Sequence, residues 1–273
     1  MKRLLIALVA VVAVCGTASA WAKFGHATVA KIAEQNLTPK AKKQLAEYLD
    51  GKSIVYYASH ADYHKNDWLL DLGFEPSNAK RRTTYPHTYG VNDDCSVVEG
   101  YRQGDEYVKN CVYFADQKIA ELKKNHRNMD SKERMIALAY VIHWLGDMHC
   151  PEHIRYPEDQ TAGNYKVEYR GRQVTMHALW DSVLLDDRHA STSFSDLALL
   201  LDTFNKQQKK EITAGTIYDW GKDSALASRH IHRVAEGTKL KRLPYMNEHA
   251  PLLESQIRKA GYRLAAVLNN IFK

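Results

Sequence analysis

The stretch that decides the fold is Val141–His153, whose sequence is VIHWLGDMHCPEH. It continues an apolar helical pattern that begins upstream with a Ser cap and an acidic first turn. His143 and Asp147 are four positions apart, so both side chains leave one helical face about one turn apart. Pro151 is expected to end or kink the helix, and His153 follows the break. This spacing suits a helix that holds one metal ion, or a carboxylate that bridges two.

The same spacing occurs a second time, at His177 and Asp181. A single pair of this kind is weak evidence, because a His hydrogen-bonded to a carboxylate explains it equally well. Two pairs with His153 between them favour a metal centre. Imidazole and carboxylate ligands without a thiolate suit catalytic zinc better than structural zinc.

The remaining chain predicts one mainly α-helical domain, an all-α fold, with a small β-hairpin near residues 165–175. The alternation on either side of Arg170-Gly171 indicates the hairpin. Apolar periodicity predicts the helices, over residues 26–37, 38–50, 53–70, 111–124, 131–150 (capped by Ser131), 176–181, 194–204, 212–229 and 251–272. Residues 73–94 contain Pro, Asn and Gly, and are expected to form an ordered, irregular loop.

The first 20 residues are predicted to be a signal peptide rather than part of the domain, which spans residues 21–273. They combine a positive start, an apolar core over residues 4–14 and the small-residue site Ala18-Ser19-Ala20. The apolar core is too short for a membrane span. Cleavage after Ala20 would leave Trp21 as the N-terminus of a periplasmic or secreted protein. A lipid anchor at Cys15 is the alternative, but the residues before it lack the Leu typical of such signals.

The net charge and the cysteine content add little to the functional assignment. The formal net charge of +6 is compatible with phosphate-bearing substrates but does not identify one. In an exported protein, Cys95 and Cys111 could close a short disulfide loop and leave Cys150 unpaired. We expect this pairing as a preference only, because connectivity cannot be deduced from sequence.

The His and Asp residues are too many for a single ion. Eight of them lie near predicted helix ends or in the Pro-marked loop: His26, Asp62, His87, His143, Asp147, His153, His177 and Asp181. A cluster of two or three metal ions is therefore the economical interpretation. Zinc lowers the pKa of bound water to about 7, and neighbouring ions stabilise charge on phosphorus. This chemistry points to phosphoester hydrolysis.

These motifs together resemble the zinc-dependent single-strand nucleases of the S1/P1 type, which share their fold with bacterial zinc phospholipase C. The resemblance covers the whole of residues 21–273. Its motifs are Trp21-x-x-x-Gly25-His26, Ala61-Asp62, Tyr85-Pro86-His87, His143-x-x-x-Gly146-Asp147-x-His149-x-Pro151-x-His153, Gly163-Asn164, His177-x-x-Trp180-Asp181 and Ala260-Gly261-Tyr262-Arg263-Leu264-Ala265.

The resemblance implies a site with three Zn²⁺ ions. One ion would be held by Asp62, His87, His143 and Asp147. A second would be held by His26 and by the α-amino group and carbonyl oxygen of Trp21, with Asp147 bridging the two ions. The third would be held by His153, His177 and Asp181. Lys65 and Asn164 match positions that the family places near the scissile phosphate, and with Asp62 and Asp147 they form the expected catalytic set.

The segment after His87 departs from the family. Fungal relatives carry an aromatic residue and then an Asp there, which sandwich and read the base. This chain has Thr88, Tyr89 and Gly90 instead. Tyr89 could supply a stacking ring from a shifted position, so Thr88 and Tyr89 are the candidate substrate residues. His60, His64 and His149 are left out of the ligand set and are given surface or supporting roles.

The leading hypothesis is an exported zinc nuclease that hydrolyses single-stranded DNA and RNA to 5′-phosphorylated products and also acts as a 3′-nucleotidase. We expect a monomer without a stable protein partner. One alternative is a zinc-dependent phospholipase C, but those relatives carry a Glu where this chain has Asp181. A second alternative is an exported zinc-binding protein without catalytic activity, against which the open ligand set argues.

Overall fold

The computed structural model describes residues 21–64, 86–103, 106–158 and 163–273. The predicted signal peptide and Lys65 lie outside these ranges. So do residues 65–70 of the helix predicted over residues 53–70 and residues 73–85 of the predicted loop at 73–94.

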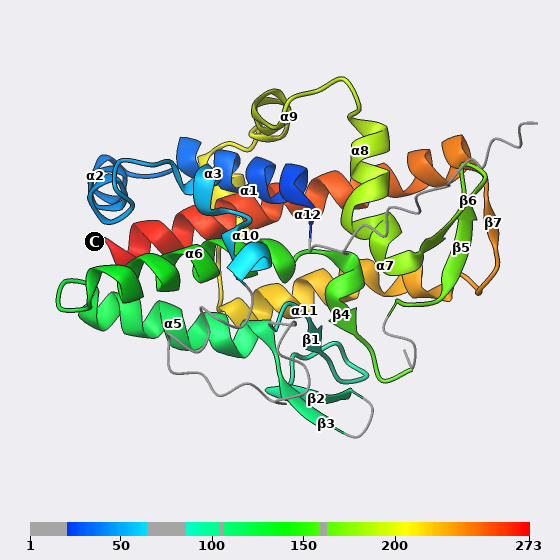
Figure 1. Cartoon of the computed structure of the whole chain (residues 1–273), viewed down its shortest axis with the longest axis horizontal. Helices are drawn as coiled ribbons and strands as arrows, with labels where there is room; N and C mark the ends of the chain where they lie inside the picture. Colours follow the sequence, from blue (N-terminus) through cyan, green and yellow to red (C-terminus); the bar gives the residue numbers. More distant parts are fainter. Residues whose placement is uncertain (1–20, 65–85, 104–105, 159–162) are drawn as a thin grey trace, which may run out of the picture.

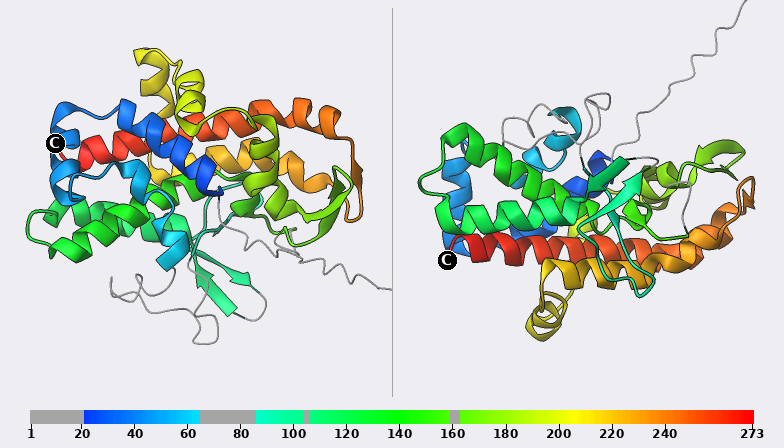
Figure 2. Two further views of the ribbon diagram at one scale, coloured as in Figure 1. Left: turned by 45° about the horizontal axis from the view of Figure 1, so that its top comes forward. Right: turned by 90° about the horizontal axis from the view of Figure 1, so that it is seen from below.

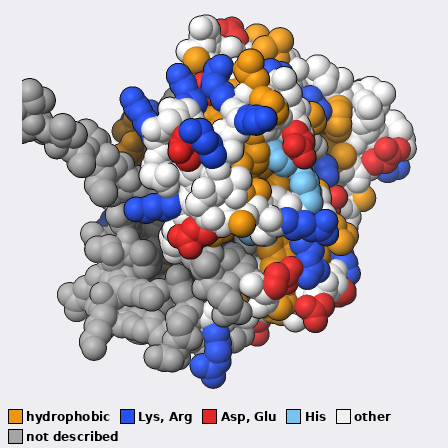
Figure 3. All heavy atoms as spheres, turned by 90° about the vertical axis from the view of Figure 1, so that its right-hand side faces the viewer, with side chains coloured by type: hydrophobic (Ala, Val, Ile, Leu, Met, Phe, Trp, Pro, Cys, Tyr) orange, Lys and Arg blue, Asp and Glu red, His pale blue; other side chains and the backbone are white. Residues whose placement is uncertain are grey.

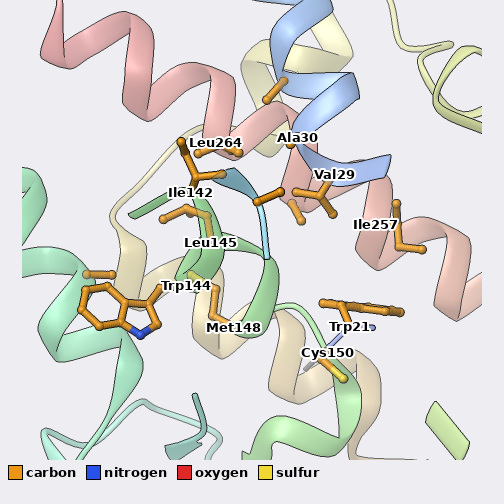
Figure 4. Close-up of a cluster of buried hydrophobic side chains, with 14 of the residues drawn as sticks. Trp21, Val29, Ala30, Ile142, Trp144, Leu145, Met148, Cys150, Ile257 and Leu264 are labelled. Carbon is orange, nitrogen blue, oxygen red and sulfur yellow. The ribbon is translucent and has the colours of Figure 1, made fainter. Parts of the chain in front are cut away.

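The longest helix, α12 (Arg242–Ile271), runs through the middle of the molecule and packs against α1 (Lys23–Gln35) and α6 (Ser131–Asp147) (Figure 1). The close approach of α1 depends on Gly261, because a Cβ there would lie 2.5 Å from Ile32 Cγ2. Figure 4 shows apolar side chains of the three helices meeting in one cluster, among them Val29, Ile142 and Leu264. This packing fixes the start of α1 and the end of α6 next to each other.

The other helices surround this centre, and Figure 2 shows two further views of them. Their bounds are α2 (Pro39–Tyr48), α3 (Ile54–Tyr57), α5 (Cys111–Asn125), α7 (Met176–Ala178), α8 (Leu184–Arg188), α9 (Phe194–Leu201), α10 (Lys206–Ile212) and α11 (Ile217–Ser228). The shorter turns are η2 (Pro151–His153), the π-helical η3 (Leu179–Val183) and η4 (Arg229–Arg233). The prediction of one mainly helical domain is confirmed.

The strands within the described ranges are short and form three small sheets. The predicted hairpin is confirmed as β5 (Lys166–Tyr169) and β6 (Arg172–Thr175), with positive φ at both turn residues. β7 (Lys239–Leu240) adds to β5 in parallel, and its two residues are too few to show a pattern in the sequence. The other pairs are β1 (Tyr89–Gly90) with β4 (Ile154–Arg155), parallel, and β2 (Gly100–Gln103) with β3 (Glu106–Lys109), antiparallel.

Several predicted helix ends were wrong. α12 begins at Arg242 and carries Pro251 inside it rather than at its start. The helix predicted over residues 212–229 is interrupted: α10 ends at Ile212, and α11 starts after Gly215 with a capping box at Thr216. The cap of α6 is Asp130 rather than Ser131, since its carboxylate accepts from the N–H groups of the first turn.

The expected Cys95–Cys111 disulfide is absent, because both cysteines are free and buried. Arg229 Nη1 donates a long hydrogen bond of 3.9 Å to Cys95 Sγ. Cys111 is the first residue of α5, and its main-chain N–H donates to the carbonyl of Thr88. The two cysteines therefore have different surroundings. Cys150 is also free and buried, as expected.

In the part of the chain that the structure describes, no helix has the length and apolar character needed to cross a membrane.

Candidate metal centre

The centre is built around Asp147, the last residue of α6, whose side chain is completely buried. Its Oδ2 lies 3.3 Å from His143 Nε2, and its Oδ1 lies 3.4 Å from His26 Nε2 and 3.5 Å from His153 Nδ1. Neither oxygen has a hydrogen-bond partner among the described residues. A buried carboxylate surrounded by imidazoles is costly to leave without a cation.

Asp147 stands between two groups of side chains. The first, which we call the inner group, consists of His26, Asp62 and His143, whose ligand atoms lie within 4.8 Å of one another. The rings of His26 and His143 stack with centroids 3.9 Å apart, and Asp62 Oδ1 is 3.6 Å from His143 Nε2. His143 Nδ1 donates to the carbonyl of Ala58 at 2.7 Å. This bond fixes the tautomer in which Nε2 can bind a metal.

The outer group consists of His87, His153 and His177, again within 4.8 Å of one another, together with Asp181. Asp181 Oδ1 lies 3.5 Å from His153 Nε2, and Asp181 Oδ2 lies 3.9 Å from His177 Nε2. The resemblance assigned His87 to the ion of Asp62 and His143, whereas the structure places its ligand atom with those of His153 and His177. Cys150 also approaches His153 and Asp181, although burial raises the pKa of its thiol well above the ordinary value.

The spacing of these atoms fits zinc. Two ligand atoms about 2.0–2.2 Å from a tetrahedral ion are about 3.3–3.6 Å apart. The contacts of Asp147 with His26, His143 and His153 all measure 3.3–3.5 Å. The contacts with His26 Nε2 and His143 Nε2 exceed a hydrogen bond and match two ligands of a shared ion. His153 Nδ1 instead donates to the main-chain carbonyl of Asp147 at 3.1 Å, which leaves its Nε2 to bind a metal beside Asp181.

The electrostatics also call for cations. Burial raises the pKa of Asp147 well above its ordinary value, and the neighbouring carboxylates of Asp62 and Asp181 raise it further. Burial lowers the pKa of His143 and His153, and lowers that of His177 to about 3 with a contribution from His87. The buried site therefore favours neutral imidazoles and penalises adjacent carboxylates. Divalent ions would reverse that penalty and use the imidazoles as ligands.

Trp21 reaches the centre through its main chain. Its side chain is completely buried, and its N–H bonds to the Asp181 carboxylate, while its carbonyl oxygen accepts from His26 N at 3.2 Å. Gly146 makes room for His26, because a Cβ at Gly146 would lie 2.6 Å from His26 Nδ1. The beginning of the domain and the end of α6 are therefore packed tightly on each other.

The candidate substrate residues Thr88 and Tyr89 do not offer a surface to a base. Tyr89 is completely buried and its hydroxyl donates to the carbonyl of Gly221 at 3.0 Å. Thr88 is 7% exposed and bonds to the hydroxyl of Tyr101. The prediction that Tyr89 stacks on a base was wrong, because β1 turns its ring into the core.

The remaining predicted residues divide by position. Asn164 is exposed beside Gly163, whose carbonyl accepts from His177 N at 2.9 Å, so it lies next to the outer group. His149 is completely buried outside the inner and outer groups, where its Nε2 contacts Arg263 Nη1 at 2.9 Å. His60 and His64 lie on the helical segment at residues 60–64 that follows α3, with their ring centroids 5.9 Å apart.

Two charged residues near the outer group were missed. Glu152 is completely buried, and its Oε2 packs against Gly163, where it leaves no room for a Cβ. Arg155 is half-buried at the end of β4. The only signal in the sequence is their closeness to His153, which by itself distinguishes neither from an ordinary surface charge.

Comparisons with known proteins identify the family of this chain. The sequence matches the family described as S1/P1 Nuclease over residues 21–273. It is 25% identical to Endonuclease 2 of Arabidopsis thaliana, over 92% of this chain and 90% of the relative. It is 25% identical to Nuclease S1 of Aspergillus oryzae, over 99% and 98% of the two chains, and 24% identical to Nuclease P1 of Penicillium citrinum, over 92% and 97%.

These matches favour the nuclease hypothesis over a phospholipase C and over a zinc-binding protein without activity. They span the segment that carries every described residue of the centre. The chain therefore belongs to the S1/P1 nuclease family, and is a hydrolytic enzyme that acts on nucleic acid with a metal cofactor.

Proposed function

We propose that this chain is an exported nuclease that binds three Zn²⁺ ions, hydrolyses single-stranded DNA and RNA to 5′-phosphorylated products and also acts as a 3′-nucleotidase. The observation that carries the proposal is the convergence of the inner and outer groups on buried Asp147. The family match over the same residues supports it.

The proposed ligand set has nine members: Trp21, His26, Asp62, His87, His143, Asp147, His153, His177 and Asp181. Asp147 is the natural bridge, because its two oxygens face different imidazoles. Asp181 has the same arrangement in the outer group, where its two oxygens face His153 and His177. Bound zinc ions would supply hydroxide near neutral pH and stabilise negative charge on phosphorus. The protein residues hold and orient these ions and exclude bulk water from the inner group.

The position of Trp21 supports export with cleavage after Ala20. Its main-chain nitrogen already faces the Asp181 carboxylate, and the family match begins at this residue. A free amine at this position can donate its lone pair to a metal, whereas a peptide nitrogen cannot. Under this proposal, removal of the signal peptide completes the metal site.

The surface suits a polyanion. Figure 3 shows one end of the molecule, where Lys and Arg side chains gather on both sides of a strip of histidine and hydrophobic side chains. Because Thr88 and Tyr89 are buried, the base-reading arrangement expected after His87 is missing. We therefore propose weak discrimination among bases, and a monomer that acts on DNA and RNA alike.

The test is a side-by-side assay of the Trp21-initiated protein on single-stranded RNA, single-stranded DNA, a 3′-nucleotide and phosphatidylcholine, with and without a chelator. We expect release of 5′-nucleotides that the chelator abolishes and added zinc restores, with phosphatidylcholine untouched. Three equivalents of zinc should be found by elemental analysis of the active protein. Phosphocholine release, or nucleotide release that the chelator leaves unchanged, would contradict the proposal.

A further inference from the structure

Arg155 is a positively charged residue near the metal centre that is not one of the proposed metal ligands. It is the second residue of β4, two positions after His153, and is half-buried. Its Nη1 donates to the carbonyl of Glu152 at 2.7 Å and contacts that of Ile154 at 3.3 Å. Because both acceptors are main-chain atoms of one turn, they hold the guanidinium in a fixed orientation.

The guanidinium lies beside the outer group. The carbonyl oxygen of Glu152 that accepts from Arg155 also accepts from His177 Nδ1 at 3.3 Å. One oxygen therefore joins Arg155 to a ring whose opposite nitrogen faces Asp181. After burial and the neighbouring His87, the charge of Arg155 contributes to lowering the pKa of His177 to about 3.

Metal binding does not explain this arrangement. A fixed positive charge beside imidazoles that hold cations weakens their hold on those cations. The guanidinium has five N–H donors, and its Nε and Nη2 bond to no group in the described ranges. Its planar fork matches the paired oxygens of a phosphate. An anion that arrives with the substrate would use both the charge and the remaining donors.

The neighbouring strand points to the same ligand. β1 and β4 pair in parallel with Gly90 opposite Arg155, and Val91 N donates to the Arg155 carbonyl at 3.0 Å. Arg155 thus stands next to the segment after His87, where Thr88 and Tyr89 are turned into the core. The positively charged side chain of Arg155 therefore lies next to the segment from which the ring of Tyr89 was expected to stack on a base.

We infer that Arg155 binds the non-bridging oxygens of a substrate phosphodiester through Nε and Nη2, so that the chain holds nucleic acid here by its phosphates rather than by its bases. This inference rests on the proposed function, because it needs the outer group to be where substrate enters. Contacts to phosphate carry no sequence information and weaken with salt.

The test measures binding rather than turnover. A single-stranded oligodeoxynucleotide whose linkages carry a methylene group in place of the bridging 3′-oxygen, and so keep both non-bridging oxygens but resist hydrolysis, is titrated into zinc-loaded protein at several salt concentrations. The variants are Arg155→Gln and Arg155→Lys. The matched control is Arg172→Gln, since Arg172 is exposed on β6. Zinc content and thermal midpoint are recorded for every variant.

Arg155→Gln should weaken binding about tenfold and reduce the slope of log affinity against log salt by about 0.7, the value for one lost phosphate contact on a single strand. Arg155→Lys should keep that slope but recover only part of the affinity, because an ammonium cannot form the fork. Zinc content should stay unchanged in both variants. Arg172→Gln should match the parent protein.

An unchanged affinity and slope in Arg155→Gln would overturn the inference. A loss of zinc or of thermal stability with an unchanged slope would also overturn it, and would make Arg155 a structural residue of the β4 turn. The wild-type protein separates this failure from that of the proposed function. If it cleaves nucleic acid normally while Arg155→Gln binds equally well, only the inference fails; if it binds but does not cleave, only the proposed function fails.

Discussion

The inner and outer groups use the same residue types but differ in how far their histidine rings reach solvent. In the inner group, His26 is 1% exposed and His143 is completely buried, while Asp62 is half-buried. In the outer group, His153 is completely buried, but His177 is 8% exposed and His87 is half-buried. Ions in the inner group are therefore expected to be part of the folded structure. The outer group is the place where a substrate phosphate can meet the metal.

The largest effect should come from Asp147→Asn, because both groups depend on this carboxylate. We expect loss of two equivalents of zinc and more than about 100-fold lower nuclease activity, since ligand loss should exceed the 10–100-fold cost of losing a supporting contact. In the presence of chelator, we expect Asp147→Asn to be more stable than the parent protein. The metal-free variant should melt at a higher temperature than the metal-free parent, because a buried charge near Asp62 and Asp181 has been removed.

Elemental analysis and thermal melting with and without chelator check this prediction. Asp50→Asn is the matched control, since Asp50 is exposed in a turn and has a positive φ that Asn tolerates. Loss of a single equivalent from Asp147→Asn would mean that the carboxylate does not bridge.

The next effect concerns the ion that Trp21 would hold together with His26. One additional Ala before Trp21 should remove the free amine from its place beside Asp181. We expect loss of one equivalent of zinc and about 100-fold lower activity, with the helical content unchanged. The control is an extension that a protease removes to regenerate Trp21. Full activity of the extended protein would show that the amine is not a ligand.

The features that could be predicted from the sequence are those fixed by local spacing. His143 and Asp147 face one side because a helix repeats every 3.6 residues, and the hairpin was indicated by alternation and by Arg170-Gly171. The His and Asp residues of the centre were selected by their number and residue types. The resemblance to a known family added a grouping of these residues, from which the structure departs at His87, and the proposal that Trp21 is a ligand.

The features that were missed depend on contacts distant in sequence. Nothing near Pro251 indicates that the helix continues through it, since burial of Met246 and Leu253 on either side holds α12 together. Tyr89 has the composition of a stacking residue, but the carbonyl of Gly221, more than 130 positions away, accepts its hydroxyl inside the core. The neighbours of His87 are likewise set by how the β1 segment packs on β4, which spacing along the chain does not encode.

The smallest of these effects should settle the place of His87. The structure puts its ring 5.0 Å from that of His153 and 6.0 Å from that of His177, measured between centroids, whereas the resemblance pairs it with Asp62 and His143. If His87 belongs to the outer group, His87→Ala and His177→Ala each lose the same equivalent of zinc. The double variant then loses no more than either single one. If it belongs to the inner group, the losses of the two single variants add, because residues that share no ion act independently.

Activity should fall roughly 10–100-fold in His87→Ala, and His64→Ala, an exposed His outside both groups, serves as the control. Non-additive losses with His177 would support the grouping seen here; non-additive losses with His143 would move His87 to the inner group and leave the outer ion with three protein ligands, which is the open coordination that catalytic zinc prefers.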